Sequence, residues 1–280
     1  MLVGKHITNH PDHLFDSLKW IIDHKCNLIQ LFIDVFHNNK SLIDKFNNFV
    51  KKNDVTVIVH SSYTINLSKS NDTRDSNIQH LIYEISIAHA INAKYIVLHM
   101  GKKLDLELSQ AYNNMFMNLV YVVNSTKNTP VKILLETPAG QGTELCFKLE
   151  DFSYFFKKIS KNKNIIQRFG ICIDTCHIFA AGYDISTLSG VRLYFEAFEE
   201  LIGIKYINLI HLNDSKNKVG SCVDRHECIG KGCIKEKMLL LLAFKFYSLN
   251  VPIILETSSD IDDLALVVNY IKRKTKIKKN

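Results

Sequence analysis

Short apolar runs recur along the chain, and each is followed by a stretch in which apolar residues return every three or four positions. The runs are rich in β-branched residues, which is typical of strands that are buried on both faces in a parallel sheet. Strands are predicted over residues 2–7, 28–33, 55–60, 95–99, 132–136, 171–174, 206–212 and 253–256. The stretches with helical spacing predict helices over residues 14–23, 41–52, 78–91, 107–123, 149–159, 193–202, 235–249 and 261–272.

The alternation of strands and helices predicts right-handed βαβ units and a parallel sheet. Eight such units in a chain of 280 residues favour closure into a single (β/α)8 TIM barrel over residues 1–280. In such barrels the chemistry lies at the carboxyl ends of the strands. One connection after a predicted strand, residues 213–234, is unusually long and rich in Gly, Asp, His and Cys. Long loops at this position usually carry function, so we expect it to contribute to a site.

The composition is ordinary for a soluble globular protein, with 46% hydrophobic and 22% charged residues. We expect an intracellular protein with no membrane segment, because no stretch is long and apolar enough to span a bilayer and the first residues lack a signal-peptide pattern. The 7 cysteines include no Cys-x-x-Cys pair and are expected to be reduced thiols, although a Cys222–Cys228 disulfide is an alternative.

The net charge is +7, and part of it lies in a basic tail at about residues 271–280. A basic balance of this size fits a polyanionic partner, although a lysine-rich terminus is often only a solvated tail. The abundance of Asn, Lys and Ile indicates an AT-rich coding genome, viral or other, and carries no information about activity.

Six of the predicted strands carry a residue that can bind a metal ion at their last or next-to-last position. These residues are His60, His99, Glu136, Asp174, His211 and Glu256. A lone strand-end His is more often a hydrogen-bonded rim residue, and a lone Asp before a helix is more often an N-cap. Six such residues at equivalent positions converge on one mouth of the barrel, because parallel strands end on the same side. The pattern therefore predicts a metal site that holds more than one ion.

Three further candidates lie just beyond strand ends. His177 follows Asp174 by three residues, and Asp224 and His226 lie in the long loop. Mixed imidazole and carboxylate ligands suit Zn²⁺ or Mn²⁺ better than Ca²⁺ or Mg²⁺, which prefer oxygen ligands. Nine candidates exceed the needs of one zinc ion, so we expect two or three ions with a carboxylate bridging two of them. His6, at the end of the first strand, could line the site.

Seven segments in consistent order resemble the endonuclease IV family of apurinic/apyrimidinic (AP) endonucleases. They span most of the chain, and together they are highly specific for that family although each alone is weak. The segments are residues 60–66 (HSSYTIN), 98–101 (LHMG), 135–144 (LETPAGQGTE), 172–177 (CIDTCH) with 181–184 (AGYD), 211–216 (HLNDSK), 224–226 (DRH) with 230–232 (GKG), and 255–257 (LET).

The resemblance implies three zinc ions at the mouth of the barrel, and the mixed donor types allow manganese as a substitute. By motif position the ligands are His60, His99 and Glu136 for the first ion, Glu136, Asp174, His211 and Glu256 for the second, and His177, Asp224 and His226 for the third. The nine residues that spacing alone selects are all included in this set.

The resemblance also implies a monomeric DNA repair nuclease that works in base excision repair, in the cytoplasm or wherever the DNA lies. It would cleave double-stranded DNA 5′ to an abasic site and leave 3′-hydroxyl and 5′-deoxyribose phosphate ends. Paired metal ions about 3.5–4 Å apart can activate water and stabilise the entering and leaving oxygens of such a reaction. We expect Glu136 to hold the pair together and Glu256 to orient the attacking hydroxide, with the third ion neutralising the leaving oxygen.

Candidate DNA contacts lie on loops after strands. Tyr63 matches the aromatic residue that the family inserts into the minor groove, although a packed loop tyrosine is an equally good interpretation. Residues 32–40 depart from the family pattern, and Phe36 or His37 is the candidate for the intercalating side chain there. Candidates for phosphate contacts are Lys216, Arg225 and Lys231, each of which could equally be a solvated surface charge.

Two other classes of protein remain open at this point. A sugar isomerase of the xylose-isomerase type is also a metal-bearing β/α barrel, but it uses two ions and leaves His177, Asp224 and His226 without a purpose. A non-catalytic, metal-stabilised DNA-binding barrel would be expected to have lost ligands, and none is lost. The metal content separates these classes, with about three zinc ions per chain expected for the nuclease.

Overall fold

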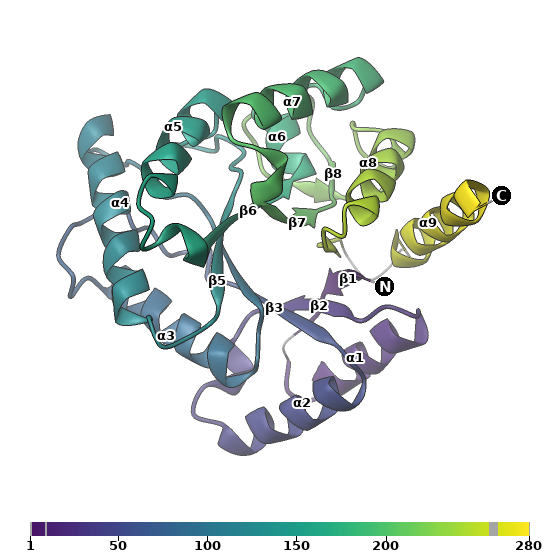
Figure 1. The fold of residues 1–280 in the computed structure, drawn as a ribbon, viewed down its shortest axis with the longest axis horizontal. Coiled ribbons are helices and arrows are strands. Elements are labelled where there is room, and N and C mark those ends of the chain that lie inside the picture. Colours follow the sequence, from purple (N-terminus) through teal and green to yellow (C-terminus); the bar gives the residue numbers. More distant parts are fainter. Residues whose placement is uncertain (1, 9, 258–262, 280) are drawn as a thin grey trace.

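A computed structural model of the chain describes residues 2–8, 10–257 and 263–279. Within these residues, eight parallel strands close into a barrel that helices surround (Figure 1). Closure is achieved where β1 pairs with both β2 and β10. The barrel strands are β1 (Val3–His6), β2 (Leu28–Leu31), β3 (Thr56–His60), β4 (Tyr95–Leu98), β5 (Lys132–Glu136), β6 (Phe169–Asp174), β7 (Ile207–His211) and β10 (Ile253–Leu255). The predicted (β/α)8 TIM barrel is therefore confirmed.

The helices largely follow the predicted order. They are α1 (Leu14–Asp23), α2 (Lys40–Lys52), α3 (Ser76–Ala90), α4 (Leu108–Ser125), α5 (Leu149–Ser160), α6 (Thr175–Ala180), α7 (Leu188–Leu201), α8 (Glu236–Ser248) and α9 (Asp263–Lys279). Short 3₁₀ turns lie at Asp34–Phe36, Ile166–Arg168 and Ile204–Tyr206. Among the described helices, none combines the length and the apolar character needed to cross a membrane.

Three helices depart most from the prediction, and one of them, α7, begins at Leu188 rather than at the predicted residue 193. The short helix α6, which follows β6 without a loop, was not predicted. The predicted start of the last helix, at residue 261, lies outside the described residues, and α9 extends beyond the predicted end to Lys279. The basic tail at 271–280 is therefore helical as far as residue 279, and residue 280 lies outside the described part.

The barrel has apolar contacts on both sides of its sheet. Inside it, a small cluster fills the centre, made of Leu28, Ile58, Tyr95, Val97, Leu134, Cys172, Leu209 and Ile254. The alternate residues of the same strands, such as Val57 and Val59 of β3, join the larger core under the helices. Because successive side chains of a strand point to opposite faces, both sets must be apolar. This explains why the strands are continuous apolar runs in the sequence.

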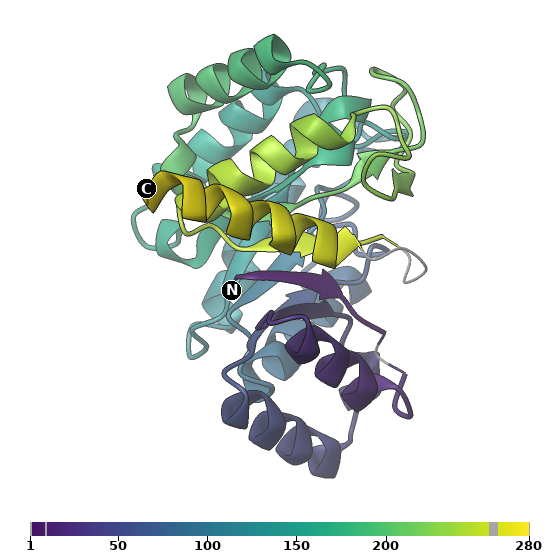
Figure 2. The ribbon, with the colours of Figure 1, turned by 90° about the vertical axis from the view of Figure 1, so that its right-hand side faces the viewer.

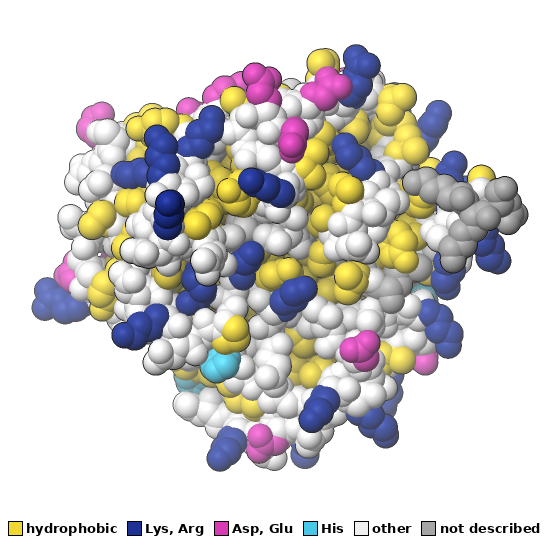
Figure 3. Space-filling model, viewed as in Figure 1, with side chains coloured by type: hydrophobic (Ala, Val, Ile, Leu, Met, Phe, Trp, Pro, Cys, Tyr) yellow, Lys and Arg dark blue, Asp and Glu magenta, His cyan; other side chains and the backbone are white. Residues whose placement is uncertain are grey.

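The two ends of the barrel differ in what they carry. In Figure 2, β1 runs from the N-terminus at the left to its arrowhead at the right, so the strands end at the right. The C-terminal end of α9 lies at the left, at the amino-terminal ends of the strands. Figures 1 and 3 look onto that amino-terminal face, over which Lys and Arg side chains are spread rather than gathered in one patch. The basic tail therefore lies at the end of the barrel opposite to the strand ends.

Candidate metal centre

A ring of side chains closes the carboxyl-terminal mouth of the barrel. Six residues of the inner cluster are each followed, two positions later, by one of the predicted strand-end ligands. Because side chains of a strand alternate with period two, residues two positions apart point to the same side. Applied to all eight strands, this register gives what we call the strand-end ring: His6, Gln30, His60, His99, Glu136, Asp174, His211 and Glu256.

Glu136 occupies a central place in the cluster of ligands and is 1% exposed. Its Oε2 lies 2.9 Å from Nε2 of His99 and 3.5 Å from Nε2 of His60. Its Oε1 lies 2.8 Å from Nδ1 of His211. Among the described atoms, Oε2 has no hydrogen-bond partner although it is buried. A buried oxygen that faces two imidazole nitrogens without a hydrogen bond is the arrangement that a shared cation would satisfy.

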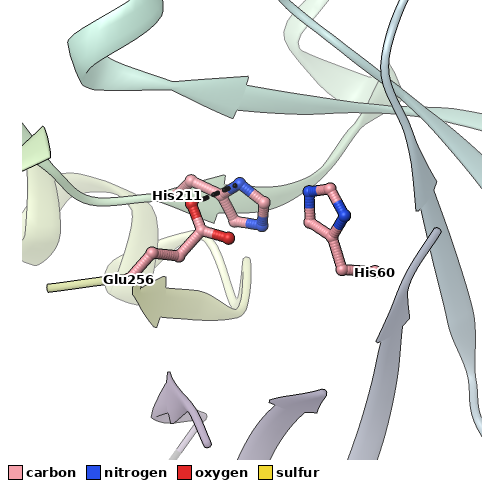
Figure 4. A group of neighbouring side chains, drawn as sticks. All are labelled: His60, His211 and Glu256. Carbon is pink, nitrogen blue, oxygen red and sulfur yellow. Dashed lines mark ion pairs between the residues drawn. The ribbon is translucent and has the colours of Figure 1, made fainter. Parts of the chain in front are cut away.

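The second group of candidate ligands adjoins this carboxylate. Nδ1 of His211 lies 3.2 Å from Oε2 of Glu256 and 3.8 Å from Oδ2 of Asp174. Figure 4 shows the His211 ring beside the Glu256 carboxylate, with the His60 ring opposite. The rings of His60 and His211 are stacked, with centroids 5.9 Å apart. These donor atoms come from β3, β6 and β7 and from the end of β10.

The third group combines α6 with the long loop. Asp224 lies between two imidazoles, with Oδ2 3.2 Å from Nε2 of His177 and Oδ1 3.2 Å from Nε2 of His226. Both Nε2 atoms are buried without a hydrogen-bond partner in the described part of the chain. Asp174 links this group to the second, because its Oδ2 lies 3.4 Å from Nε2 of His226. All nine predicted ligands thus lie in one continuous cluster.

Local structure explains how His177 and the long loop reach the cluster. Asp174 caps α6 by accepting a 2.9 Å hydrogen bond from the backbone N–H of His177. The buried Asp214 carboxylate organises the loop by accepting hydrogen bonds from the backbone N–H groups of Gly230, Gly232 and Ile234, at 3.0, 3.2 and 2.8 Å. The hydrogen bonds of Asp214 therefore hold together the loop that carries Asp224 and His226.

Backbone carbonyls set the proton position on two of the histidines. The Nδ1–H of His60 donates to the carbonyl of Ser61 at 2.7 Å, and the Nδ1–H of His177 donates to the carbonyl of Thr137 at 3.0 Å. The remaining nitrogen, Nε2, is then free to face the carboxylates. Metal-binding histidines are commonly fixed in this way by a partner on their other nitrogen.

The charges of the cluster are strongly coupled. Burial alone would raise the pKa of Glu136, but the facing His99 and His211 hold the pKa well below its ordinary value. Burial opposes protonation of His226, yet Asp174 and Asp224 raise the pKa of this imidazole to about 9. The Glu136 carboxylate therefore stays ionised, and the cluster attracts positive charge, which protons or metal ions can supply. Metal binding would displace those protons, so it should weaken as the pH falls.

Sequence reasoning missed two buried amides of the site, those of Gln30 and Asn213. Gln30 of the strand-end ring is 0% exposed, and so is Asn213. Asn213 donates through Nδ2 to Asp174 and Glu256 at 2.7 and 3.0 Å and accepts from the backbone N–H of Glu256 at 3.0 Å. The period-two register would have found Gln30, because it follows Leu28 of the inner cluster by two positions.

A cavity of about 290 Å³ lies over the cluster, and a larger cleft of about 570 Å³ adjoins it. Both are lined by Tyr63, His99 and Asp224. His6 lines the smaller cavity, as its strand-end position predicted, and so does Phe32, whose ring lies 5.5 Å from that of His60. The larger cleft also has a cationic lining, from Lys69, Lys102 and Arg225.

The predicted DNA contacts have different surroundings. Tyr63 is 71% exposed at the rim of the cavity, so its ring is available to a ligand. Lys216, Arg225 and Lys231 are exposed on the long loop. The ring of His37 packs against Tyr83 with centroids 5.4 Å apart, and His37 also contacts Asn38.

The suggestion that Phe36 intercalates into DNA is corrected by the structure. This ring is 0% exposed and packs against Phe46 with centroids 4.9 Å apart. The 3₁₀ turn at Asp34–Phe36 directs the side chain into the core under α2. The cysteines agree with the favoured prediction, since all seven are free thiols within the described residues, Cys222 and Cys228 included.

Comparison with known proteins places this geometry in a family. Residues 18–274 match the family model described as "Xylose isomerase-like TIM barrel". The "Probable endonuclease 4" of Mycoplasma mobile is 35% identical over 266 residues, which cover 92% of this chain and 91% of the relative. The chain belongs to the endonuclease IV family. The family predicted from the seven segments is therefore confirmed, and membership of the endonuclease IV family makes the chain a nuclease.

Solved structures confirm the fold of this endonuclease IV family member. Endonuclease IV from Thermus thermophilus superposes with a TM-score of 0.77 at 19% identity, covering 98% of this chain and 99% of that one. A D-tagatose 3-epimerase-like protein superposes with a TM-score of 0.74 at 21% identity, covering 99% and 98%. At these identities the likeness is one of fold alone, and it is shared by nucleases and sugar epimerases.

Proposed function

We propose that the chain is a zinc-dependent endonuclease of base excision repair. It would cleave the phosphodiester bond 5′ to abasic sites in duplex DNA and leave 3′-hydroxyl and 5′-deoxyribose phosphate ends. The observation that carries the proposal is the cluster of nine imidazole and carboxylate side chains, in which buried donor atoms of Glu136, His177 and His226 lack hydrogen-bond partners among the described residues.

The donor set fits zinc. Ligand atoms of His60, His99 and Glu136 lie within 4.8 Å of one another, and so do those of Asp174, His177 and His226. Imidazole nitrogen and carboxylate oxygen are common zinc ligands, and manganese accepts the same mixture. Three ions per chain would use all nine residues, in the sets that the sequence motifs give.

Zinc ions held by these residues would supply an activated water and positive charge for the phosphoryl oxygens. Glu136 faces histidines of two of the sets and would hold two ions together. Burial would raise the pKa of Glu256, but the facing His211 and a hydrogen bond with His6 keep it well below the ordinary value, so this carboxylate stays ionised. Its inward oxygen could therefore accept a hydrogen bond from the attacking water and orient it.

The surroundings of the cluster fit a nucleic-acid strand. Lys69, Lys102 and Arg225 line the larger cleft beside the ligands, where they could contact phosphates. Tyr63 stands exposed at the rim, where it could stack on a base or enter a groove. Curated relatives of nearly full length carry the name endonuclease 4, which favours DNA over a sugar as the substrate.

The test uses the purified chain, its bound metal and two labelled duplexes. Metal content is measured first, and about three zinc ions per chain are expected. A duplex with one tetrahydrofuran abasic analogue should be incised on the 5′ side of the lesion, while an undamaged duplex of the same sequence should remain intact. Removal of zinc by a chelator should abolish incision, and added zinc should restore it.

Two results would overturn the proposal. One is a zinc-loaded protein that cleaves neither duplex, and the other is equal cleavage of both. Two ions per chain together with epimerisation of a ketose would instead indicate the sugar isomerase class. One ion or none, with binding of DNA and no cleavage, would indicate a non-catalytic barrel.

A further inference from the structure

Gln30 occupies a position of the strand-end ring that carries no metal ligand. It follows Leu28 by two residues in β2, so its side chain points into the mouth of the barrel as the ligands do. It is 0% exposed. A buried amide at this place must have partners for its donors and its acceptor, since an unpaired buried polar group is costly.

The amide of Gln30 contacts three other residues of the ring. Its Nε2 donates to Oε1 of Glu256 at 2.6 Å and lies 3.0 Å from Nδ1 of His6. Its Oε1 lies 2.8 Å from Nε2 of His211. One side chain thus joins the outer atoms of two candidate ligands, His211 and Glu256.

These contacts determine where the proton of His211 lies. An ionised carboxylate can only accept hydrogen bonds, so the Gln30 Nε2 must be the atom that faces Glu256. The Gln30 Oε1 then faces His211 and can only accept, so His211 carries a proton on Nε2. The nitrogen left over is Nδ1, which lies 2.8 Å from Glu136 and 3.2 Å from the inward oxygen of Glu256.

We propose that Gln30 is a positioning residue of the metal centre, which sets the tautomer of His211 and holds the outer oxygen of Glu256. Both residues then present their inner atoms, Nδ1 and Oε2, to the second metal ion. The inference rests on the proposed function in that it takes this centre to bind zinc. It adds a role for a residue that does not itself bind the metal.

His211 differs from two other histidines of the centre in what fixes it. His60 and His177 donate to backbone carbonyls, which no substitution removes. His211 depends on a side chain, so a substitution at residue 30 can release it. Loss of such an outer partner typically lowers metal affinity by about 10- to 100-fold.

The test compares Gln30→Met, which keeps the length of the side chain and removes its hydrogen bonds, with a matched control. The control is Asn118→Leu, because Asn118 is also a buried amide and bonds the carbonyls of Leu67 and Ser70 instead of the centre. Circular dichroism checks that both variants fold. Zinc retained at a buffered free Zn²⁺ concentration is then measured in wild type and in both variants.

We expect Gln30→Met to bind zinc about 10- to 100-fold more weakly and Asn118→Leu to bind as wild type does. The second readout is the long-range ¹H–¹⁵N spectrum of ¹⁵N-histidine in the zinc-loaded protein, with the His211 signal assigned by its loss in His211→Gln. Wild type should show His211 protonated on Nε2, and Gln30→Met should show a mixture of tautomers.

The inference is overturned if Gln30→Met keeps both the wild-type zinc affinity and the wild-type tautomer. It is also overturned if His211 of the zinc-loaded wild type is protonated on Nδ1. A wild-type protein that retains no zinc is a different result, since it would overturn the proposed function and this inference with it.

Discussion

A single buried carboxylate, that of Glu136, brings the candidate ligands of this nuclease together. The imidazoles nearest to its two oxygens are those of His60, His99 and His211, at 3.5, 2.9 and 2.8 Å. Its surroundings keep it ionised although it is almost completely buried. Changing Glu136 would remove the neighbour that these imidazoles share. We therefore expect this residue to be important for catalysis.

We predict that Glu136→Gln lowers incision of abasic duplex by orders of magnitude with little loss of fold. The amide keeps the volume of the side chain but cannot bridge two cations, on which water activation depends. Incision rates at saturating zinc and thermal melting by circular dichroism measure the two effects. Glu107→Gln, at an exposed position outside the centre, serves as the control. Near-normal incision by Glu136→Gln would contradict the role assigned to the carboxylate.

The position of Asp224 in the centre also leads to a prediction about the kinetics of the enzyme. It lies between His177 and His226 at the side of the centre that borders the larger cleft. We expect Asp224→Ala or His226→Ala to lower turnover more than affinity for abasic DNA. The third ion would neutralise negative charge on the leaving oxygen, and this charge develops only in the transition state. Single-turnover rates and binding constants are measured for each variant, with Lys218→Ala in the same loop as control. A loss confined to binding would refute this role.

At the scale of the elements, α3 is tied to the loop that follows β3. The buried Glu84 of α3 accepts hydrogen bonds from the backbone N–H of Ser62 at 3.0 and 3.3 Å. His80 on the same helix lies 3.5 Å away. Tyr63, whose exposed ring lies at the rim of the cavity, is the next residue along that loop. The Glu84 carboxyl of α3 therefore holds the backbone next to Tyr63.

This tether should make stability depend on pH. Burial raises the pKa of Glu84 from an ordinary value of 4.5 to about 7. The folded state therefore holds the proton more tightly than the unfolded chain does, and this contribution to stability is complete below the unfolded pKa and lost as the pH rises through the folded pKa. Glu84→Gln, which stays neutral, should gain stability relative to wild type when the pH is raised from 5 to 8. Urea unfolding at both values measures the difference, and an equal difference at the two pH values would exclude the effect.

The elements also show what the sequence could predict. The strands were predictable because burial on both faces makes them continuous apolar runs, and the strand-end ligands followed from the common direction of parallel strands. Gln30 was missed because an amide is not among the usual zinc ligands, although its register in β2 is that of the candidate ligands. Phe36 was wrongly predicted to contact DNA. A single 3₁₀ turn is too short to produce a periodic pattern in the sequence, so the sequence contains no sign that this turn directs the ring into the core. Helix α6 was too short to show a period and is defined by its cap, Asp174.

At the scale of the whole molecule, the basic tail and the metal centre lie at opposite ends of the barrel. Figure 2 shows the C-terminal end of α9 beside the amino-terminal ends of the strands, while the candidate ligands lie at the carboxyl ends. The exposed Lys272, Arg273 and Lys276 in this part of α9 are therefore remote from the site. If these residues bind DNA, they must do so outside the cleft.

We predict that truncation after Ile271 weakens binding to undamaged duplex modestly and leaves turnover at saturating abasic substrate unchanged. Lysine and arginine contacts with phosphate release counterions, so the truncated chain should also show a shallower dependence of affinity on salt. Binding at several salt concentrations and incision at saturation measure the two effects. The control is the full-length chain in which Lys272, Arg273 and Lys276 are changed to Gln. This variant loses the charges but keeps the length of α9, so it separates the effect of the charges from the effect of losing part of the helix. A large drop in turnover would show that the tail supports the barrel or reaches the site.

The strand-end ring takes one residue from the last two positions of every barrel strand or from the position directly after the strand, and this has a consequence for synthesis of the chain. Gln30 and Glu256, whose side chains form a hydrogen bond with each other, are 226 positions apart in the sequence. The second set of ligands is therefore incomplete until β10 has left the ribosome and paired with β1. A chain released before β10 is made lacks Glu256, so it cannot assemble the complete cluster of candidate ligands. Assembly of the candidate metal centre thus waits for the last strand of the barrel, because β10 both closes the barrel against β1 and precedes Glu256.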